Sequence, residues 1–145
     1  MAAMKTVKVT ATGPDGWVVK TKAGKHEALI DQPEAMGGTD SAPTPLDYTF
    51  IALASCLVTI AKIVAMQKKI DLRGVDVEVT GDLNLDVLRG QNKDDRAGFK
   101  LIKAIMKVDA DLTDEEKKAF IHEVDSRCPV SDNLLNPTPI QVELG

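Results

Sequence analysis

The two cysteines of the chain stand in contrasting surroundings. Cys56 lies inside the almost unbroken apolar run ALASCLVTIAK, whereas Cys128 directly precedes a proline in SRCPVSDNLL. A cysteine can serve as a small hydrophobic residue of a core, or its thiol can react with oxidants and with a second thiol. Two explanations are therefore open: two separate packing residues, or a pair of thiols that react together.

Cys128 has the stronger local argument for reactivity. Because Pro129 suits the first position of a helix, Cys128 is expected to cap a short helix. A thiol at a helix N-terminus faces unpaired N–H groups and the positive end of the helix dipole, and both lower its pKa. Arg127, next to it in sequence, is a candidate for stabilising the thiolate further. The alternative is that Cys128 only caps the helix.

Cys56 has no comparable argument from its neighbours. Burial in the middle of a helix raises the pKa of a thiol and makes it unreactive. Taken alone, Cys56 is better explained as a packing residue. The two histidines, His26 and His122, have no ligand spacing with the cysteines, so we expect no metal site and no cofactor.

The composition is that of one globular domain spanning residues 1–145, with 43% hydrophobic and 28% charged residues. The net charge is −4 and no block of basic residues is present, which argues against a nucleic-acid partner. With one Trp, one Tyr and three Phe, the chain has too few aromatic side chains for stacking bases.

No targeting or membrane segment is expected. The N-terminal residues alternate between polar and apolar and lack the continuous apolar segment of a secretory signal. The apolar run 50–66 contains Lys62 and is shorter than the roughly 20 residues that a membrane-spanning helix needs. We therefore expect a cytoplasmic protein without a membrane partner, in which thiols are normally reduced.

The N-terminal part of the chain is expected to form a three-stranded antiparallel meander. Alternating polarity and turn signals such as GPDG predict strands at residues 5–11, 17–22 and 26–31. The segment 32–44 has no periodicity and is predicted to be a functional loop. A long helix is then expected from Thr44 or Pro45 to about Lys69.

The C-terminal part is expected to add strands at 74–88 and 99–110, joined by a polar loop at 89–98. Gly81 interrupts the apolar side of the first of these strands and is expected to mark a bulge or bend. A helix at 112–127 opens with a capping box formed by Thr113 and Glu116. The short helix that begins at Cys128 follows, and the alternating segment 138–145 is predicted to be an edge strand.

This element order, βββ-α-ββ-α-α-β, places the chain in the α+β class. The long helix is apolar almost all round: between Phe50 and Ala61 its only polar side chains are Ser55 and Thr59. Such a helix must be covered on every side in a soluble protein. One small chain has difficulty covering it, so we expect a homodimer.

Two segments of the chain resemble the OsmC/Ohr family of osmotically induced and organic-hydroperoxide-resistance proteins. SAPTPLDYTFIALASC, ending at Cys56, is similar to the segment that opens the family's central helix. CPVSDNLLNPTPIQVEL, starting at Cys128, is similar to the family's C-terminal element. The element order and the separation of the cysteines also agree, so the resemblance covers nearly the whole chain.

The resemblance implies a cysteine-based peroxidase built as an intertwined dimer, with the two long helices in its middle. The residue matched by Cys56 would attack an organic hydroperoxide and become a sulfenic acid. The residue matched by Cys128 would resolve it as a disulfide, which a dithiol then reduces. Asp47 approximately matches the acidic residue near the start of the central helix.

The sequence departs from the family pattern at one position. The family's peroxidases hold the thiolate with an arginine from the N-terminal sheet region, and this chain has no arginine before Arg73. His26, Arg127 and Arg96 are candidates to supply the missing charge. His26 is otherwise a polar residue at the start of a strand. The alternative function is a dimeric binding protein that keeps the fold without efficient peroxidase activity.

Overall fold

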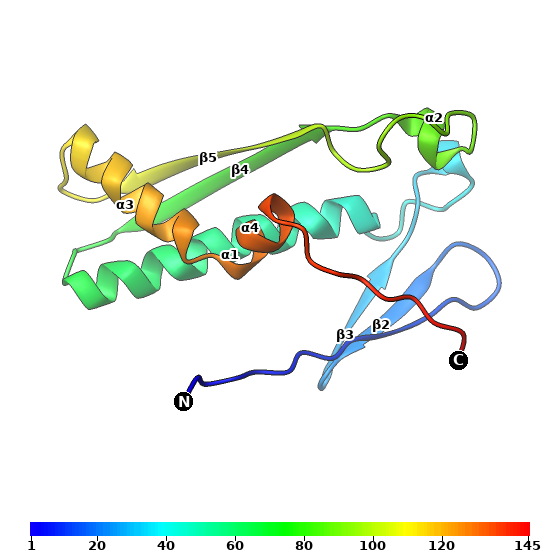
Figure 1. Ribbon diagram of the computed structural model, residues 1–145, viewed down its shortest axis with the longest axis horizontal. Coiled ribbons are helices and arrows are strands. Elements are labelled where there is room, and N and C mark those ends of the chain that lie inside the picture. The colour runs from blue at the N-terminus through cyan, green and yellow to red at the C-terminus, as the bar shows by residue number, and fades with distance from the viewer. The chain divides into compact units, whose positions relative to one another are not determined.

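The computed structural model of the protein describes every residue from 1 to 145. The chain forms two compact units, residues 1–49 and 50–145, which are described separately below (Figure 1). The mixed α+β class, with antiparallel sheets and one long helix, is confirmed. The single domain expected for residues 1–145 stays a prediction.

The first unit is built on a three-stranded antiparallel sheet in the order β1-β2-β3. Its strands are β1 (Thr10–Thr12), β2 (Val19–Ala23) and β3 (His26–Ile30), and a short 3-10 helix, Glu34–Met36, follows. The expected meander is confirmed, although β1 is shorter than predicted. Thr10 pairs with Lys22, so residues 5–8 run past the end of β2 and have no strand opposite them.

The long helix α1 (Pro45–Lys68) begins at the predicted position and ends one residue earlier than expected. At its start, the Thr44 hydroxyl accepts a hydrogen bond from the Asp47 N–H, and the Asp47 carboxylate accepts bonds from the Thr44 N–H and hydroxyl. These reciprocal bonds satisfy N–H groups that the first turn leaves without helical partners. At its end, Lys69 adopts a positive φ of 56° and the chain leaves the helix.

The second unit packs a β-hairpin and two further helices against α1 (Figure 1). The hairpin consists of β4 (Gly74–Asp82) and β5 (Leu101–Asp109), which pair antiparallel in a regular register. Alternate residues of both strands face the helix and exclude water from one core. The core residues are Leu53, Leu57, Ala61, Val64, Ala65, Val108, Ala110, Phe120, Val124 and Cys128.

Two details of the hairpin differ from the sequence prediction. The strand expected at 74–88 ends at Asp82, because the Asn84 side chain accepts a hydrogen bond from the Asp86 N–H and starts the one-turn helix α2 (Leu85–Leu88). The expected bulge at Gly81 is also wrong, since the ladder continues through its pairing with Ile102. A Cβ at Gly81 would lie 2.9 Å from the Leu101 carbonyl oxygen, so close backbone approach explains this glycine.

The C-terminal helices start where the sequence predicts. Helix α3 (Asp114–Ser126) opens with the capping box of Thr113 and Glu116, and α4 (Pro129–Leu135) is capped by Cys128. The edge strand expected at 138–145 is wrong, because neither sheet of the chain pairs with this segment. Ile140, Val142 and Leu144 are consequently 84%, 93% and 101% exposed. Alternating polarity can produce a strand only where a neighbouring edge supplies hydrogen-bond partners.

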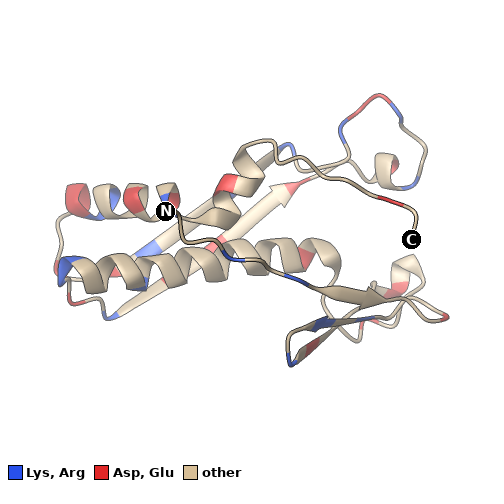
Figure 2. Cartoon of the chain, turned by 60° about the horizontal axis from the view of Figure 1, so that its bottom comes forward, with Lys and Arg blue, Asp and Glu red and all other residues tan.

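One side of α1 faces the core and the other faces outward. Its buried stripe is Leu53, Leu57, Ala61, Val64 and Ala65. Ile51 and Met66, on the opposite side, are 48% and 73% exposed. Figure 2 shows few charged residues along this helix compared with α3. By length and composition α1 is apolar enough to cross a membrane, although the core helix of a soluble protein meets the same criteria.

Candidate active site: two thiols in contact

The structure brings the two cysteines together. The Sγ atoms of Cys56 and Cys128 lie 2.9 Å apart, and both cysteines are free thiols. A disulfide bond is about 2.05 Å long, so a displacement of about 1 Å separates the two sulfurs from bonding distance. Cys128 is 1% exposed, whereas Cys56 is only partly buried. The Cys56 thiol is therefore more accessible to solvent than the Cys128 thiol.

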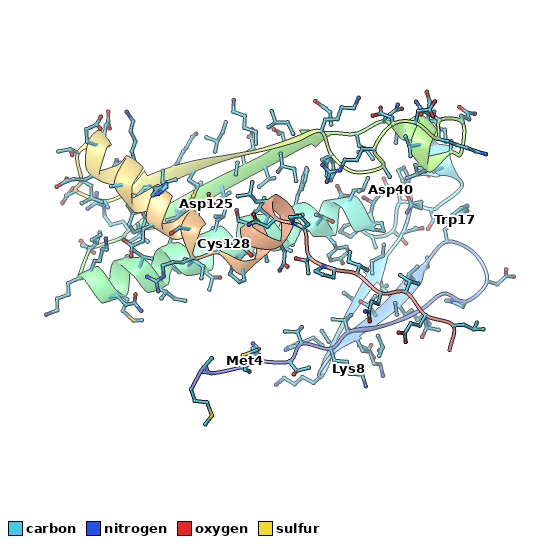
Figure 3. The ribbon with its side chains drawn as sticks, viewed as in Figure 1. Met4, Lys8, Trp17, Asp40, Asp125 and Cys128 are labelled. Carbon is cyan, nitrogen blue, oxygen red and sulfur yellow. The ribbon has the colours of Figure 1, made fainter.

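Each thiol is placed by the helix that carries it. Cys56 follows Leu53 by three residues and precedes Leu57, so its side chain lies at the margin of the buried stripe of α1. Cys128 stands between the end of α3 and the start of α4, where its N–H donates to the Asp125 carbonyl oxygen at 3.1 Å. Figure 3 shows Cys128 at this junction, with Asp125 close by on α3.

The electrostatic setting of Cys128 differs from the expectation. Its Sγ accepts a hydrogen bond from the Ser131 N–H at 3.4 Å, as a helix cap should. This bond lowers the pKa of the Cys128 thiol, but burial and the neighbouring Cys56 thiol outweigh it and raise the pKa above its ordinary value of 9.0. The prediction of a lowered pKa is therefore wrong, because it considered the effect of the helix N-terminus but not the desolvation of the buried thiol.

Asp47 acts as a capping residue in this chain. Its carboxylate is engaged by Thr44, and its charge lies in the first turn of α1, where the helix dipole favours an anion. Nine residues separate it from Cys56, which corresponds to about 14 Å along a helix. Its role as an acidic partner of the thiolate stays a prediction.

The cationic candidates lie in three different places. The Arg127 guanidinium donates to Gln67 Oε1 at 2.9 Å and to Glu123 Oε1 at 3.4 Å, so it is engaged near the C-terminal end of α1. Arg96 is exposed on the loop before β5. His26 is the exposed first residue of β3 in the first unit. None of the three has a recorded hydrogen bond to a cysteine.

A cavity of about 830 Å³ lies in the second unit, lined by sequence neighbours of both cysteines but by neither cysteine itself. Its lining includes Leu57, which follows Cys56 in sequence, and Ser131, whose N–H donates to Cys128 Sγ. Much of the wall is apolar, and it also includes the basic residues Arg96, Lys100, Lys118 and His122 and the acidic Asp125. A mainly apolar wall with polar groups at some positions is typical of small-molecule sites.

Sequence reasoning missed Asp31, the one fully buried charged residue. Its carboxylate accepts hydrogen bonds from the Gln32 N–H and from the N–H and hydroxyl groups of Thr39 and Ser41, over 2.7–3.1 Å. These donors, led by the Thr39 hydroxyl, hold its pKa far below the ordinary value of 3.8. The run of Thr and Ser after Gly37 and Gly38 is the only sequence signal for this arrangement.

No three His, Cys, Asp or Glu side chains come together in a way that would hold a metal ion. Two free thiols in contact can exchange between the dithiol and the disulfide, and an exposed thiol can be oxidised first while its buried neighbour condenses with it.

Comparison with known proteins identifies the family. Residues 38–143 match the family model OsmC, described as OsmC-like protein, which confirms the resemblance noted in the sequence. A comparison with curated proteins found no match.

Solved structures share the fold at low sequence identity. An OsmC-like protein from Mycoplasma pneumoniae is 22% identical with a TM-score of 0.79, over 90% of this chain and 88% of that one. The organic hydroperoxide resistance protein OsmC from Legionella pneumophila is 23% identical with a TM-score of 0.69, over 92% and 91%. An OsmC-like protein of unknown function from Vibrio cholerae is 11% identical with a TM-score of 0.73, over 89% and 93%.

Proposed function

The chain belongs to the OsmC-like family, and from this premise we propose that it is a thiol-dependent peroxidase that reduces organic hydroperoxides. The contact of 2.9 Å between the sulfurs of Cys56 and Cys128 is the observation that carries the proposal. Two packing cysteines have no need to touch, whereas a peroxidatic and a resolving cysteine must. The structurally similar Legionella pneumophila protein is described as an organic hydroperoxide resistance protein, which supports the same chemistry.

The first step oxidises Cys56. Its thiolate attacks the terminal oxygen of the hydroperoxide, the O–O bond breaks, and an S–O bond forms. The alkoxide leaves with a proton as an alcohol, and Cys56 becomes a sulfenic acid. Cys56 is suited to this step because it is the more exposed of the two thiols. The buried Cys128, whose pKa is raised, is a poorer first nucleophile.

The second step joins the two sulfurs. The sulfur of Cys128 attacks the sulfenic sulfur of Cys56, the S–O bond breaks, and the hydroxyl leaves with the Cys128 proton as water. The product is a Cys56–Cys128 disulfide. An external dithiol then donates two electrons and two protons by exchange, which restores both thiols and leaves the reductant as a disulfide.

The apolar setting favours organic hydroperoxides over hydrogen peroxide. Cys56 lies in an apolar helix, and Leu53 and Leu57, which flank it on that helix, are part of the cavity lining. An alkyl group that leaves water for such walls gains roughly 25 cal/mol per Å² of buried apolar surface, and hydrogen peroxide has no such group. We therefore expect a preference for bulky apolar substrates.

The working form is proposed to be a cytoplasmic homodimer. Proteins of the family are soluble, yet α1 exposes Ile51 and Met66, and the segment 138–145 exposes alternate apolar residues. A second copy that covers these surfaces would remove them from water. Asp47, His26 and Arg127 are proposed to stabilise the Cys56 thiolate. Arg96 is a further candidate for this role because it lines the cavity.

A second candidate function is binding without efficient peroxidase activity. It is favoured by the lack of any arginine before Arg73, together with a cavity large enough for a small molecule. The only permanently charged basic side chains in the first unit are those of lysines. Unlike the planar guanidinium of arginine, a lysine ammonium cannot form two parallel hydrogen bonds to one partner.

The test is dithiol-dependent consumption of tert-butyl and cumene hydroperoxides, with hydrogen peroxide measured in parallel. Replacing Cys56 with Ser should abolish consumption and sulfenic acid trapping. Cys128→Ser should keep one turnover and leave a trappable sulfenic acid at Cys56. If the first turnover survives in Cys56→Ser and is lost in Cys128→Ser, the roles are reversed. If neither substitution alters hydroperoxide consumption, the peroxidase proposal is wrong and the binding function becomes the preferred proposal.

A further inference from the structure

We infer that Asp125 and Ser131 are positioning residues that hold Cys128 against Cys56 for disulfide formation, an inference that rests on the proposed peroxidase cycle. The two residues flank Cys128 in sequence, one in the last turns of α3 and the other in the first turn of α4. Figure 3 shows Asp125 beside Cys128 at the junction of these helices.

Three hydrogen bonds close a ring around Cys128. The Ser131 hydroxyl donates to Asp125 Oδ1 at 2.5 Å, and the Cys128 N–H donates to the Asp125 carbonyl oxygen at 3.1 Å. The Ser131 N–H completes the ring by donating to Cys128 Sγ at 3.4 Å. Asp125 thus binds the backbone of Cys128 and also the residue whose N–H fixes the direction of its sulfur.

The side-chain bond is needed because α4 has little else to hold it. The helix is seven residues long, and none of them is fully buried. Only Arg127 and Cys128 separate it from α3, so the chain can pivot at this junction. A helix this short is marginal without tertiary support. The Asp125–Ser131 bond is the one recorded side-chain bond that ties α4 to α3.

Disulfide formation requires a precise position of the Cys128 sulfur, whereas oxidation of Cys56 does not. Cys56 lies on α1, and its reaction with a hydroperoxide needs no contact with the Cys128 sulfur. The Cys128 sulfur must stay within about 1 Å of bonding distance and in line with the breaking S–O bond. A misplacement of about 1 Å can slow a reaction between positioned groups by roughly a hundredfold.

The chain contains a matched control at the other end of α4. Thr138 donates its hydroxyl to Asn133 Oδ1 at 2.8 Å, which is also a bond between two polar side chains that flank part of α4. This bond does not involve Cys128. Thr138→Val removes it with little change in side-chain volume, so the variant reports any general effect of losing a hydrogen bond near α4.

The experiment compares Ser131→Ala, Asp125→Ala, the rescue variant Ser131→Thr and the control Thr138→Val in single-turnover reactions with cumene hydroperoxide. Because Asp125 and Ser131 also line the cavity, sulfenic acid formation is measured in each variant, and we expect Ser131→Ala and Asp125→Ala to slow it less than they slow disulfide formation. Each should slow disulfide formation roughly tenfold or more, so that Cys56 sulfenic acid accumulates. The double variant should be no slower than either single one, because both remove the same bond. Ser131→Thr should restore the rate.

A second measurement keeps the inference testable if the protein consumes no hydroperoxide. Each reduced variant is equilibrated with glutathione buffers, and the fraction of Cys56–Cys128 disulfide is measured. We expect the disulfide of Ser131→Ala to form about tenfold less readily than that of the wild type, equivalent to about 30 mV. Wild-type equilibria and rates in both alanine variants, or an equal effect of Thr138→Val, would overturn the inference. If the wild-type protein consumes no hydroperoxide but the glutathione equilibria differ as expected, the proposed peroxidase function is wrong and the positioning inference holds.

Discussion

Each compact unit buries one ionisable group, and the two groups respond to burial in opposite directions. Asp31 in the first unit is 0% exposed, and Cys128 in the second is 1% exposed. The pKa of Asp31 is lowered, chiefly by the hydroxyl of Thr39, whereas the pKa of Cys128 is raised, chiefly by desolvation. Burial alone therefore does not decide the charge of a group.

The difference lies in the hydrogen-bond donors. Five donors surround the Asp31 carboxylate and replace its water, so it stays ionised and fastens the loop at 32–43. Cys128 receives a long bond from the Ser131 N–H and faces a second thiol. The first arrangement stabilises a permanent anion and is structural. The second keeps a neutral thiol beside the atom with which it can react.

The largest effect on stability is expected at the structural anion. Asp31→Ala leaves five donors without an acceptor in a buried site, and the melting temperature should fall by roughly 5 °C or more. Cys128→Ser should change stability by at most about 1 kcal/mol, because serine is a preferred helix cap. Thermal unfolding of both variants checks this contrast. Equal losses would mean that both residues are structural.

The pH dependence sharpens the comparison. Because the pKa of folded Asp31 lies below its unfolded value of about 3.8, its contribution to stability is complete above that value and is lost as the pH falls further. The stability difference between wild type and Asp31→Asn should therefore be constant from about pH 5 to 8 and shrink below pH 3.8. Denaturant unfolding at several pH values measures it. A difference that shrinks already near neutral pH contradicts the bonding described for Asp31.

The thiols themselves should differ in accessibility. Iodoacetamide should modify Cys56 at least tenfold faster than Cys128 in the reduced native protein, because the reagent must reach the sulfur and attack a thiolate. Peptide mapping after short exposure gives the two rates. In Cys56→Ser, the remaining thiol should titrate above pH 9.0 by its ultraviolet absorbance, since burial is the main cause of its raised pKa. If the Cys128 thiol titrates near neutral pH instead, the helix N-terminus lowers its pKa more than burial raises it.

A smaller effect is expected at Glu123, which links α3 to the end of α1 through Lys68 and Arg127. The ion pair with Lys68 is the main cause of the lowered pKa of Glu123. Glu123→Gln should lower stability slightly at neutral pH, and the difference should disappear as the pH falls below about 4.5. Salt should also reduce it.

Helix caps and alternating strands allowed much of the fold to be predicted from the sequence. Thr113 with Glu116, and Cys128 with Pro129, are local signals because the groups that bond lie within one turn. The segment 138–145 shows where such signals fail. Its alternation is consistent with a strand, but a strand needs a neighbouring edge, and no local pattern reports whether that edge exists.

The site was predictable in part for the same reason. The cap position of Cys128 is local, but its burial depends on α1 and the core, so the direction of its pKa shift was predicted wrongly. The pairing with Cys56 came from the family resemblance and not from spacing. Asp31 escaped notice because its five bonds come from residues up to ten positions away in an irregular loop.

The most direct test of the account is the fate of the two thiols after one equivalent of cumene hydroperoxide. We predict that the reduced protein loses both thiols and two hydrogen atoms, and that peptide mapping finds a single disulfide between Cys56 and Cys128 within one chain. Cys128→Ser should instead gain one oxygen at Cys56. Retention of both thiols, or oxidation at Cys128 while Cys56 stays reduced, would contradict the account.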